Sequence, residues 1–99
     1  MINLKEAYTK AVDYWIGVCG EKGSEADRYS PASIVEYDKA YFFWLIYDYD
    51  PDEEYGGGAT IRVEKSDGLC RSMHPLDGGY DDLKTIKVWQ GKDAVRLVK

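Results

Sequence analysis

Residues 41–49 read YFFWLIYDY and residues 57–68 read GGATIRVEKSDG, and these two stretches decide the fold. The first stretch is apolar on both faces of an extended chain, which is typical of a central strand that is covered on both sides. The second stretch alternates apolar and polar residues from Ala59 onwards and ends in the hairpin signal Ser66-Asp67-Gly68. Together they predict the centre of an antiparallel sheet.

The neighbouring segments extend this sheet on both sides. Residues 32–37 (ASIVEY) predict a first strand, and Asp38-Lys39 predicts a tight turn into the long strand at residues 40–49. Residues 69–73 predict the return strand of the hairpin, which Pro75 ends because proline cannot donate to a ladder. Alternation divides the long strand into two sets of side chains that point to opposite faces: Phe42, Trp44 and Ile46 on one, and Tyr41, Phe43, Leu45 and Tyr47 on the other. In residues 59–65, Ala59, Ile61 and Val63 are expected to point inward, and Thr60, Arg62 and Glu64 outward.

An amphipathic helix is predicted at residues 4–18. Asn3 followed three residues later by Glu6 resembles a capping box, and Gly20 and Gly23 provide the stop. Apolar residues recur between them at helical spacing: Leu4, Ala7, Tyr8, Ala11, Trp15 and Val18. The polar residues 20–31 form the connection to the sheet.

The end of the chain leaves two possibilities open. Residues 83–90 and 93–99 can form a final hairpin around Gly91-Lys92, or residues 80–86 can form a short helix before a last strand. Either way, the 99 residues predict a single domain of the α+β class. Its expected architecture is an N-terminal amphipathic helix packed on a four- to six-stranded antiparallel sheet.

The net charge of −5 is unevenly distributed along the chain. Residues 36–82 hold twelve acidic and four basic side chains, whereas residues 83–99 hold one acidic and five basic side chains. An acidic surface repels phosphate groups, which argues against binding of nucleic acid or of an anionic membrane. It favours fast, salt-sensitive association with a cationic protein. The alternative is that the charge only keeps a small protein in solution.

The sequence holds little equipment for catalysis or for a cofactor. The single histidine, His74, precedes a proline and has no evident partner that would make it a general base. Glycines 56–58 precede a strand and are not followed by Lys-Ser/Thr, so they do not match a phosphate-binding loop. A calcium loop that started at Asp48 would have Glu53 in place of its glycine and Ala59 in place of its last glutamate. We therefore expect no enzymatic activity, no cofactor and no metal site.

The cysteines and the apolar segments bear on the compartment. Cys19 and Cys70 are far apart and form no CxxC pattern. In a cytosolic domain, such residues are usually buried free thiols, and the alternative is a disulfide between them. The chain has neither a run of about 18 apolar residues nor the apolar region of a signal peptide. These features predict a cytoplasmic protein, unless a leader has been removed.

One segment combines exposed charge with aromatic residues and is the candidate partner-binding site. Carboxylates are rarely buried without a partner, and tyrosine is favoured in protein interfaces. The candidate residues are Tyr47, Asp48, Tyr49, Asp50, Asp52, Glu53, Glu54 and Tyr55. The alternative is a hydrated acidic loop between two strands.

The order of helix, short strand, long aromatic strand and glycine-led hairpin resembles the Immunity protein 35 family. The resemblance covers roughly residues 3–74 and depends on a small set of positions: Ala7, Ala11, Trp15, Trp44, Gly58, Ile61, Val63, Lys65 and Gly68. Residues 75–99 and the pair Ala59-Thr60 depart from the family pattern. The resemblance implies a small bacterial α+β protein that binds and neutralises a cognate toxin without catalysis.

The leading hypothesis is a small acidic immunity-type protein that binds a toxin enzyme through the basic surface of that enzyme. The alternative is a phage-encoded acidic inhibitor of a host defence nuclease, which would use the same acidity to mimic nucleic acid. A third class, a small-molecule-binding or enzymatic domain, requires a polar pocket under the helix, and a ligand-bound pocket lined by Trp15, Trp44 or Trp89 would favour it. Neither the oligomeric state nor the identity of the partner follows from the sequence.

Overall fold

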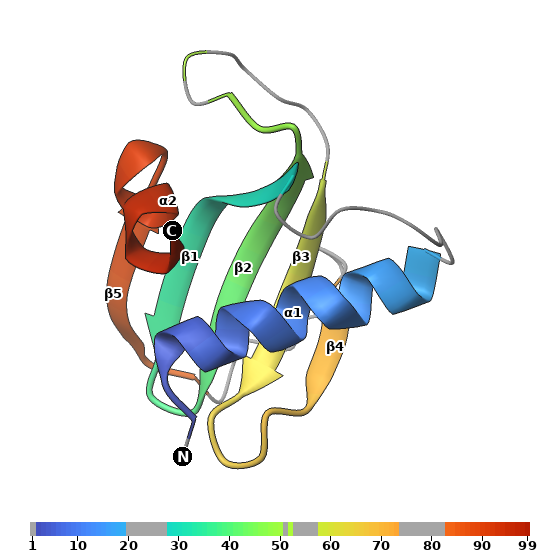
Figure 1. Cartoon of the computed structure of the whole chain (residues 1–99). Helices are drawn as coiled ribbons and strands as arrows, with labels where there is room; N and C mark the ends of the chain where they lie inside the picture. The colour runs from blue at the N-terminus through green and yellow to red at the C-terminus, as the bar shows by residue number, and fades with distance from the viewer. Residues whose placement is uncertain (1, 20–27, 51, 53–57, 74–82) are drawn as a thin grey trace.

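The computed structural model describes residues 2–19, 28–50, 52, 58–73 and 83–99. Within these residues, helix α1 (Leu4–Cys19) lies across one face of a five-stranded antiparallel sheet (Figure 1). The strands are β1 (Tyr29–Tyr37), β2 (Ala40–Tyr47), β3 (Ala59–Glu64), β4 (Cys70–Met73) and β5 (Thr85–Gln90). A short helix, α2 (Lys92–Val98), follows β5. The predicted α+β class and its helix-on-sheet architecture are confirmed.

The strand order is β4-β3-β2-β1-β5, so the aromatic strand β2 lies at the centre as predicted. Phe43 of β2 is fully buried, and its cross-strand neighbours Ile34 and Ile61 are fully buried as well. The α1 residues Ala7 and Ala11 are also fully buried. Because alanine side chains are small, they let the helix approach the sheet closely. The main core therefore lies between α1 and the sheet.

Helix α1 begins with the predicted cap. The Asn3 Oδ1 atom accepts a hydrogen bond from the Glu6 backbone N–H at 2.9 Å, and the Asn3 amide donates to Glu6 Oε1 at 2.9 Å. The apolar face is wider than predicted, since Tyr14 and Ile16 also pack against the core, and it differs most at two positions. Val18 is 54% exposed because it lies near the end of the helix, whereas Val12, which the predicted face omitted, is 3% exposed.

Strand β1 begins at Tyr29, three residues before the predicted start. Its pairing with β2 shifts register between Pro31 and Ser33, which makes Ala32 an extra residue in the strand. A bulge is one of the few places where a strand accepts a proline, because the ladder is already interrupted there, and Pro31 also lies outside the part of β1 that pairs with β5. Assigning Pro31 to the connection was therefore wrong, and the bulge is the reason.

Both alternatives for the end of the chain were wrong. The first segment of the expected hairpin is a strand, β5, but residues 92–98 form helix α2 rather than the second strand. Strand β5 pairs with β1 at the edge of the sheet. Ala94 is fully buried, and Leu97 and Val98 pack against the core at helical spacing from it. Seven residues are too few for their sequence pattern to separate the period of a helix from that of a strand.

The face of the sheet opposite α1 holds a buried charge. Arg62 points to this face, as alternation predicts, but it is only 6% exposed. Its guanidinium donates to Glu64 at 2.8 Å and lies over the Phe42 ring, 5.8 Å from the ring centre. The stem of the arginine therefore covers part of this face, while its charge is paired.

Substituting Tyr8 by Phe is expected to lower the free energy of unfolding by about 1 kcal/mol at neutral pH. The Tyr8 hydroxyl donates to the Tyr29 carbonyl oxygen at 3.0 Å, and burial raises the pKa of Tyr8 to about 12. The unfolded phenol ionises near its usual value of 10. As the pH rises from about 10 to about 12, wild type should therefore lose up to roughly 2 kcal/mol more stability than the variant. Urea unfolding across this pH range measures the difference, and parallel curves would contradict the prediction.

Candidate functional site

The predicted partner-binding residues lie where β2 ends. Tyr47 is the last residue of β2, and Asp48, Tyr49, Asp50 and Asp52 follow it. Glu53, Glu54 and Tyr55 lie outside the described residues. The structure thus places five of the eight candidates at one end of the sheet, on the side where β2 leaves towards β3 (Figure 1).

Arg28 holds the first two of these residues in place. Its guanidinium donates to both carboxylate oxygens of Asp48, at 2.8 Å for the bond to Oδ1, and it lies 4.8 Å from the centre of the Tyr47 ring. The Asp48 backbone N–H donates to the Arg28 carbonyl oxygen at 2.9 Å, and the φ angle of Asp48 is 53°. Arg28 therefore neutralises Asp48, which makes this carboxylate a structural element of the turn more than a free negative charge. No sequence pattern indicated this pair, because 20 positions separate its members.

The next two carboxylates, Asp50 and Asp52, are exposed. Asp50 is exposed, and its Oδ1 atom accepts a hydrogen bond from the Asp52 backbone N–H at 2.9 Å. This local bond is typical of an Asx turn and fixes the path of the chain between the two residues. The Asp52 side chain is 80% exposed, and its Oδ1 atom lies 3.8 Å from Lys92 Nζ. An exposed pair at this distance contributes about 0–1 kcal/mol, so it can be exchanged for another cation at little cost.

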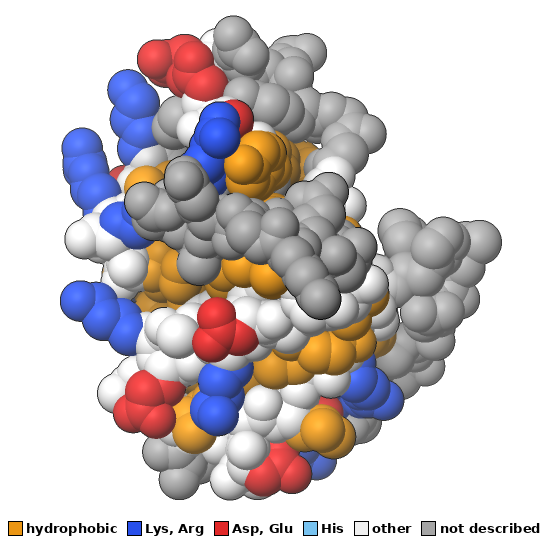
Figure 2. Space-filling model, turned by 45° about the vertical axis from the view of Figure 1, so that its right-hand side comes forward, with side chains coloured by type: hydrophobic (Ala, Val, Ile, Leu, Met, Phe, Trp, Pro, Cys, Tyr) orange, Lys and Arg blue, Asp and Glu red, His pale blue; other side chains and the backbone are white. Residues whose placement is uncertain are grey.

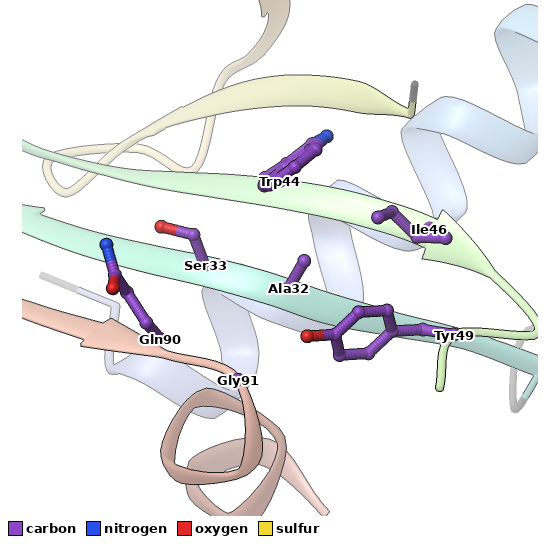
Figure 3. A pocket seen from close by; sticks show the side chains of 7 residues that line it. All are labelled: Ala32, Ser33, Trp44, Ile46, Tyr49, Gln90 and Gly91. Carbon is purple, nitrogen blue, oxygen red and sulfur yellow. The ribbon is translucent and has the colours of Figure 1, made fainter. Parts of the chain in front are cut away.

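A pocket of about 290 Å³ lies beside this segment, on the sheet face opposite α1. Three cross-strand neighbours form a row along it: Trp44 of β2 lies opposite Ser33 of β1, and Ser33 lies opposite Gln90 of β5. Figure 3 shows the seven described residues that line the pocket: Ala32, Ser33, Trp44, Ile46, Tyr49, Gln90 and Gly91. Tyr49 enters from the β2 end, so the pocket and the candidate site share a residue.

The bulge in β1 builds part of this pocket. A bulge changes the alternation of side chains, and here the consecutive residues Ala32 and Ser33 both face the pocket. The Ala32 carbonyl oxygen also accepts a hydrogen bond from the Gly91 backbone N–H at 3.0 Å, which fixes the start of α2 at the pocket wall. Sequence reasoning did not find this pocket. Pro31 inside a strand was the one signal that could have indicated the bulge.

The other described carboxylates of the acidic segment are largely paired or bound to backbone. Lys65 Nζ lies 2.7 Å from Glu36 Oε2, and Glu64 Oε1 accepts from Arg62 and Arg71 at 2.8 and 3.5 Å. The Lys84 backbone N–H donates to Asp38 and holds the pKa of that carboxyl below its usual value.

Figure 2 shows the acidic side chains of the described residues spread among lysines and arginines on one face, without a continuous patch among them. The position of Asp50 and Asp52, rather than the total charge, therefore distinguishes the β2 end.

A scan against protein-family models, a search of curated proteins and a search of solved structures each return no match.

Reactive groups are few in the part of the chain that the structure describes. Cys70 is a free thiol whose pKa burial raises, and His74 lies outside the described residues. Among residues 2–19, 28–50, 52, 58–73 and 83–99, no group of three or more His, Cys, Asp or Glu side chains is placed to hold a metal ion. Within the same ranges, no helix has the length and apolar character needed to span a membrane.

Proposed function

We propose that this protein is an inhibitor that binds the basic surface of a toxin enzyme and neutralises it, using the end of β2 as its contact and carrying out no catalysis. The observation that carries the proposal is the exposure of Asp50 and Asp52 beside tyrosines at the end of a well-packed sheet. Negative charge at an exposed edge accelerates encounter with a cationic partner, and neighbouring aromatic side chains add apolar contact.

The geometry at the β2 end supports binding without a large rearrangement. Tyr47 is 42% exposed, and its ring contacts both the Arg28 guanidinium and the Tyr29 ring, whose centre lies 5.1 Å away. Aromatic side chains that are already fixed lose little entropy when a partner covers them. The resemblance of the sequence to the Immunity protein 35 family favours a toxin as the partner over other basic proteins.

The proposal has a two-step test. The chain is first co-expressed with the product of each neighbouring gene and scored for rescue from toxicity, which identifies the partner. The association rate of the purified pair is then measured at low and high salt for wild type and for the double variant Asp50→Asn/Asp52→Asn. Asparagine at position 50 keeps the acceptor of the local turn, so the variant removes charge without removing that hydrogen bond.

We expect the double variant to associate about five-fold more slowly at low salt and to show a weaker salt dependence. The matched control is Asp13→Asn/Asp67→Asn, which removes the same charge from α1 and from the β3–β4 turn. Equal slowing by both double variants would show a general charge effect and would count against the β2 end as the contact. Inhibition of a nuclease instead of rescue from a neighbouring toxin would favour the alternative of a nuclease inhibitor.

A further inference from the structure

We infer that the pocket beside Tyr49 receives an arginine side chain of the partner protein, an inference that rests on the proposed function and names the residue type that it recognises. The size of the pocket sets the class of ligand. At about 290 Å³ it lies just below the range of about 300–1,000 Å³ for small-molecule sites, so it suits one inserted side chain.

The lining matches the chemistry of a guanidinium group. Trp44 and Tyr49 offer aromatic rings on which a planar cation can stack. Hydrogen-bond acceptors lie around them: the Ser33 hydroxyl, the Gln90 side-chain carbonyl and the Tyr49 hydroxyl (Figure 3). Arginine presents five N–H donors in one plane and can satisfy several acceptors at once, whereas lysine presents a compact charge that is more strongly hydrated.

The charge around the pocket favours a cation. None of the seven described lining residues carries a formal charge. Asp50 follows Tyr49 in the chain, and Asp52 lies 3.8 Å from Lys92, which follows the lining residue Gly91. The exposed Asp52 carboxylate therefore lies near a lysine that adjoins the Gly91 wall of the pocket. An incoming arginine can replace Lys92 as the partner of Asp52, since the present pair is exposed and weak.

The same stacking already occurs twice within this fold. The Arg28 guanidinium lies 4.8 Å from the centre of the Tyr47 ring, and that of Arg62 lies 5.8 Å from the centre of the Phe42 ring. In each case a carboxylate, Asp48 or Glu64, pairs with the same guanidinium. The pocket offers aromatic rings to an arginine from outside, and the exposed pair of Asp52 with Lys92 adjoins its Gly91 wall.

The test uses the whole chain and a glycine-arginine-glycine peptide blocked at both ends, and follows binding by NMR chemical shifts. We expect shifts at the backbone of Ser33 and Gln90 and at the Trp44 indole N–H, with a dissociation constant in the millimolar range for so small a ligand. The analogous peptides with lysine or with neutral citrulline should bind at least three-fold more weakly, since they lose the planar fork or the charge.

Variants connect the binding to the pocket. Ser33→Ala and Gln90→Ala should each weaken binding of the arginine peptide about five-fold, and Trp44→Leu should weaken it at least as much. Ser66→Ala, at the exposed β3–β4 turn, is the matched control and should bind as wild type does. Gln90 is exposed on an edge strand, so its variant keeps the test valid if Trp44→Leu fails to fold. Equal binding of the arginine, lysine and citrulline peptides, or shifts away from the pocket, would overturn the inference.

The two proposals can fail separately. If the arginine peptide binds the pocket but Asp50→Asn/Asp52→Asn leaves association with the toxin unchanged, the arginine preference of the pocket stands and the β2 end fails as the charged contact. If association responds to those carboxylates but the peptide shifts no pocket resonance, the arginine pocket fails alone.

Discussion

Replacing Phe43 by Ala is expected to lower the free energy of unfolding by about 3–5 kcal/mol. Phe43 is fully buried, and its ring meets that of Tyr8 at 5.6 Å between ring centres, in an edge-to-face arrangement across the helix–sheet boundary. Truncation would remove this contact and leave a cavity between fully buried Ile34 and Ile61. A domain of this size typically has 5–15 kcal/mol of stability, so the variant would be marginal. Urea unfolding followed by circular dichroism measures the loss.

Two further variants serve as controls for the effect of Phe43→Ala. Phe43→Leu keeps most of the volume and should cost about 1–2 kcal/mol. Val18→Ala removes an apolar side chain that is 54% exposed and should change stability by no more than about 0.5 kcal/mol. If Phe43→Ala cost no more than Val18→Ala, Phe43 would not be at the centre of the core.

Replacing Gly58 by Ala is expected to cost about 3–5 kcal/mol, from backbone strain and steric overlap together. Gly58 has a φ of +109°, and an added Cβ would lie 2.7 Å from both the Leu45 carbonyl oxygen and Trp44 Nε1. The carbonyl belongs to the central strand and cannot move without disturbing the β2–β3 ladder. Displacement of Trp44 would also alter the pocket, so the Trp44 indole resonance should shift together with the loss of stability.

Two other glycines separate the cost of backbone strain from the cost of steric overlap. Gly91 has a φ of +59° and nothing within 4 Å of an added Cβ, so Gly91→Ala should cost backbone strain alone, about 1–3 kcal/mol. Gly17 lies in helix α1 with open space around it, and Gly17→Ala should stabilise the protein by about 0.5–1 kcal/mol. Similar losses for the Gly58 and Gly91 variants would show that Gly58 makes no close contact with β2.

Local patterns predicted most of the fold. The cap at Asn3, the alternation in β2 and the turn at Asp38-Lys39 involve residues a few positions apart, whose preferences can be judged in isolation. The end of the chain was misjudged because Val95 and Leu97 fit the spacing of a strand as well as that of a helix. The buried position of Ala94, which packs α2 against the core, decided for the helix.

The candidate site was predicted in part. Composition indicated that Tyr47, Asp50 and Asp52 lie in an exposed acidic and aromatic segment, and the structure places them at the end of β2. Composition could not show that Arg28 neutralises Asp48, because the pair depends on how β1 and β2 align. It also could not show the pocket, whose row of Trp44, Ser33 and Gln90 comes from three different strands.

Periodicity and turn chemistry in the chain alone thus determined that a helix precedes an antiparallel sheet with an aromatic central strand, because these signals arise between near neighbours. Only the tertiary structure decided that β5 joins the sheet beside β1, that Ala32 and Ser33 at the β1 bulge line a pocket and that Asp52 lies 3.8 Å from Lys92. Those features depend on contacts between residues far apart in sequence. Such contacts form only when burial of the common core brings the strands into register.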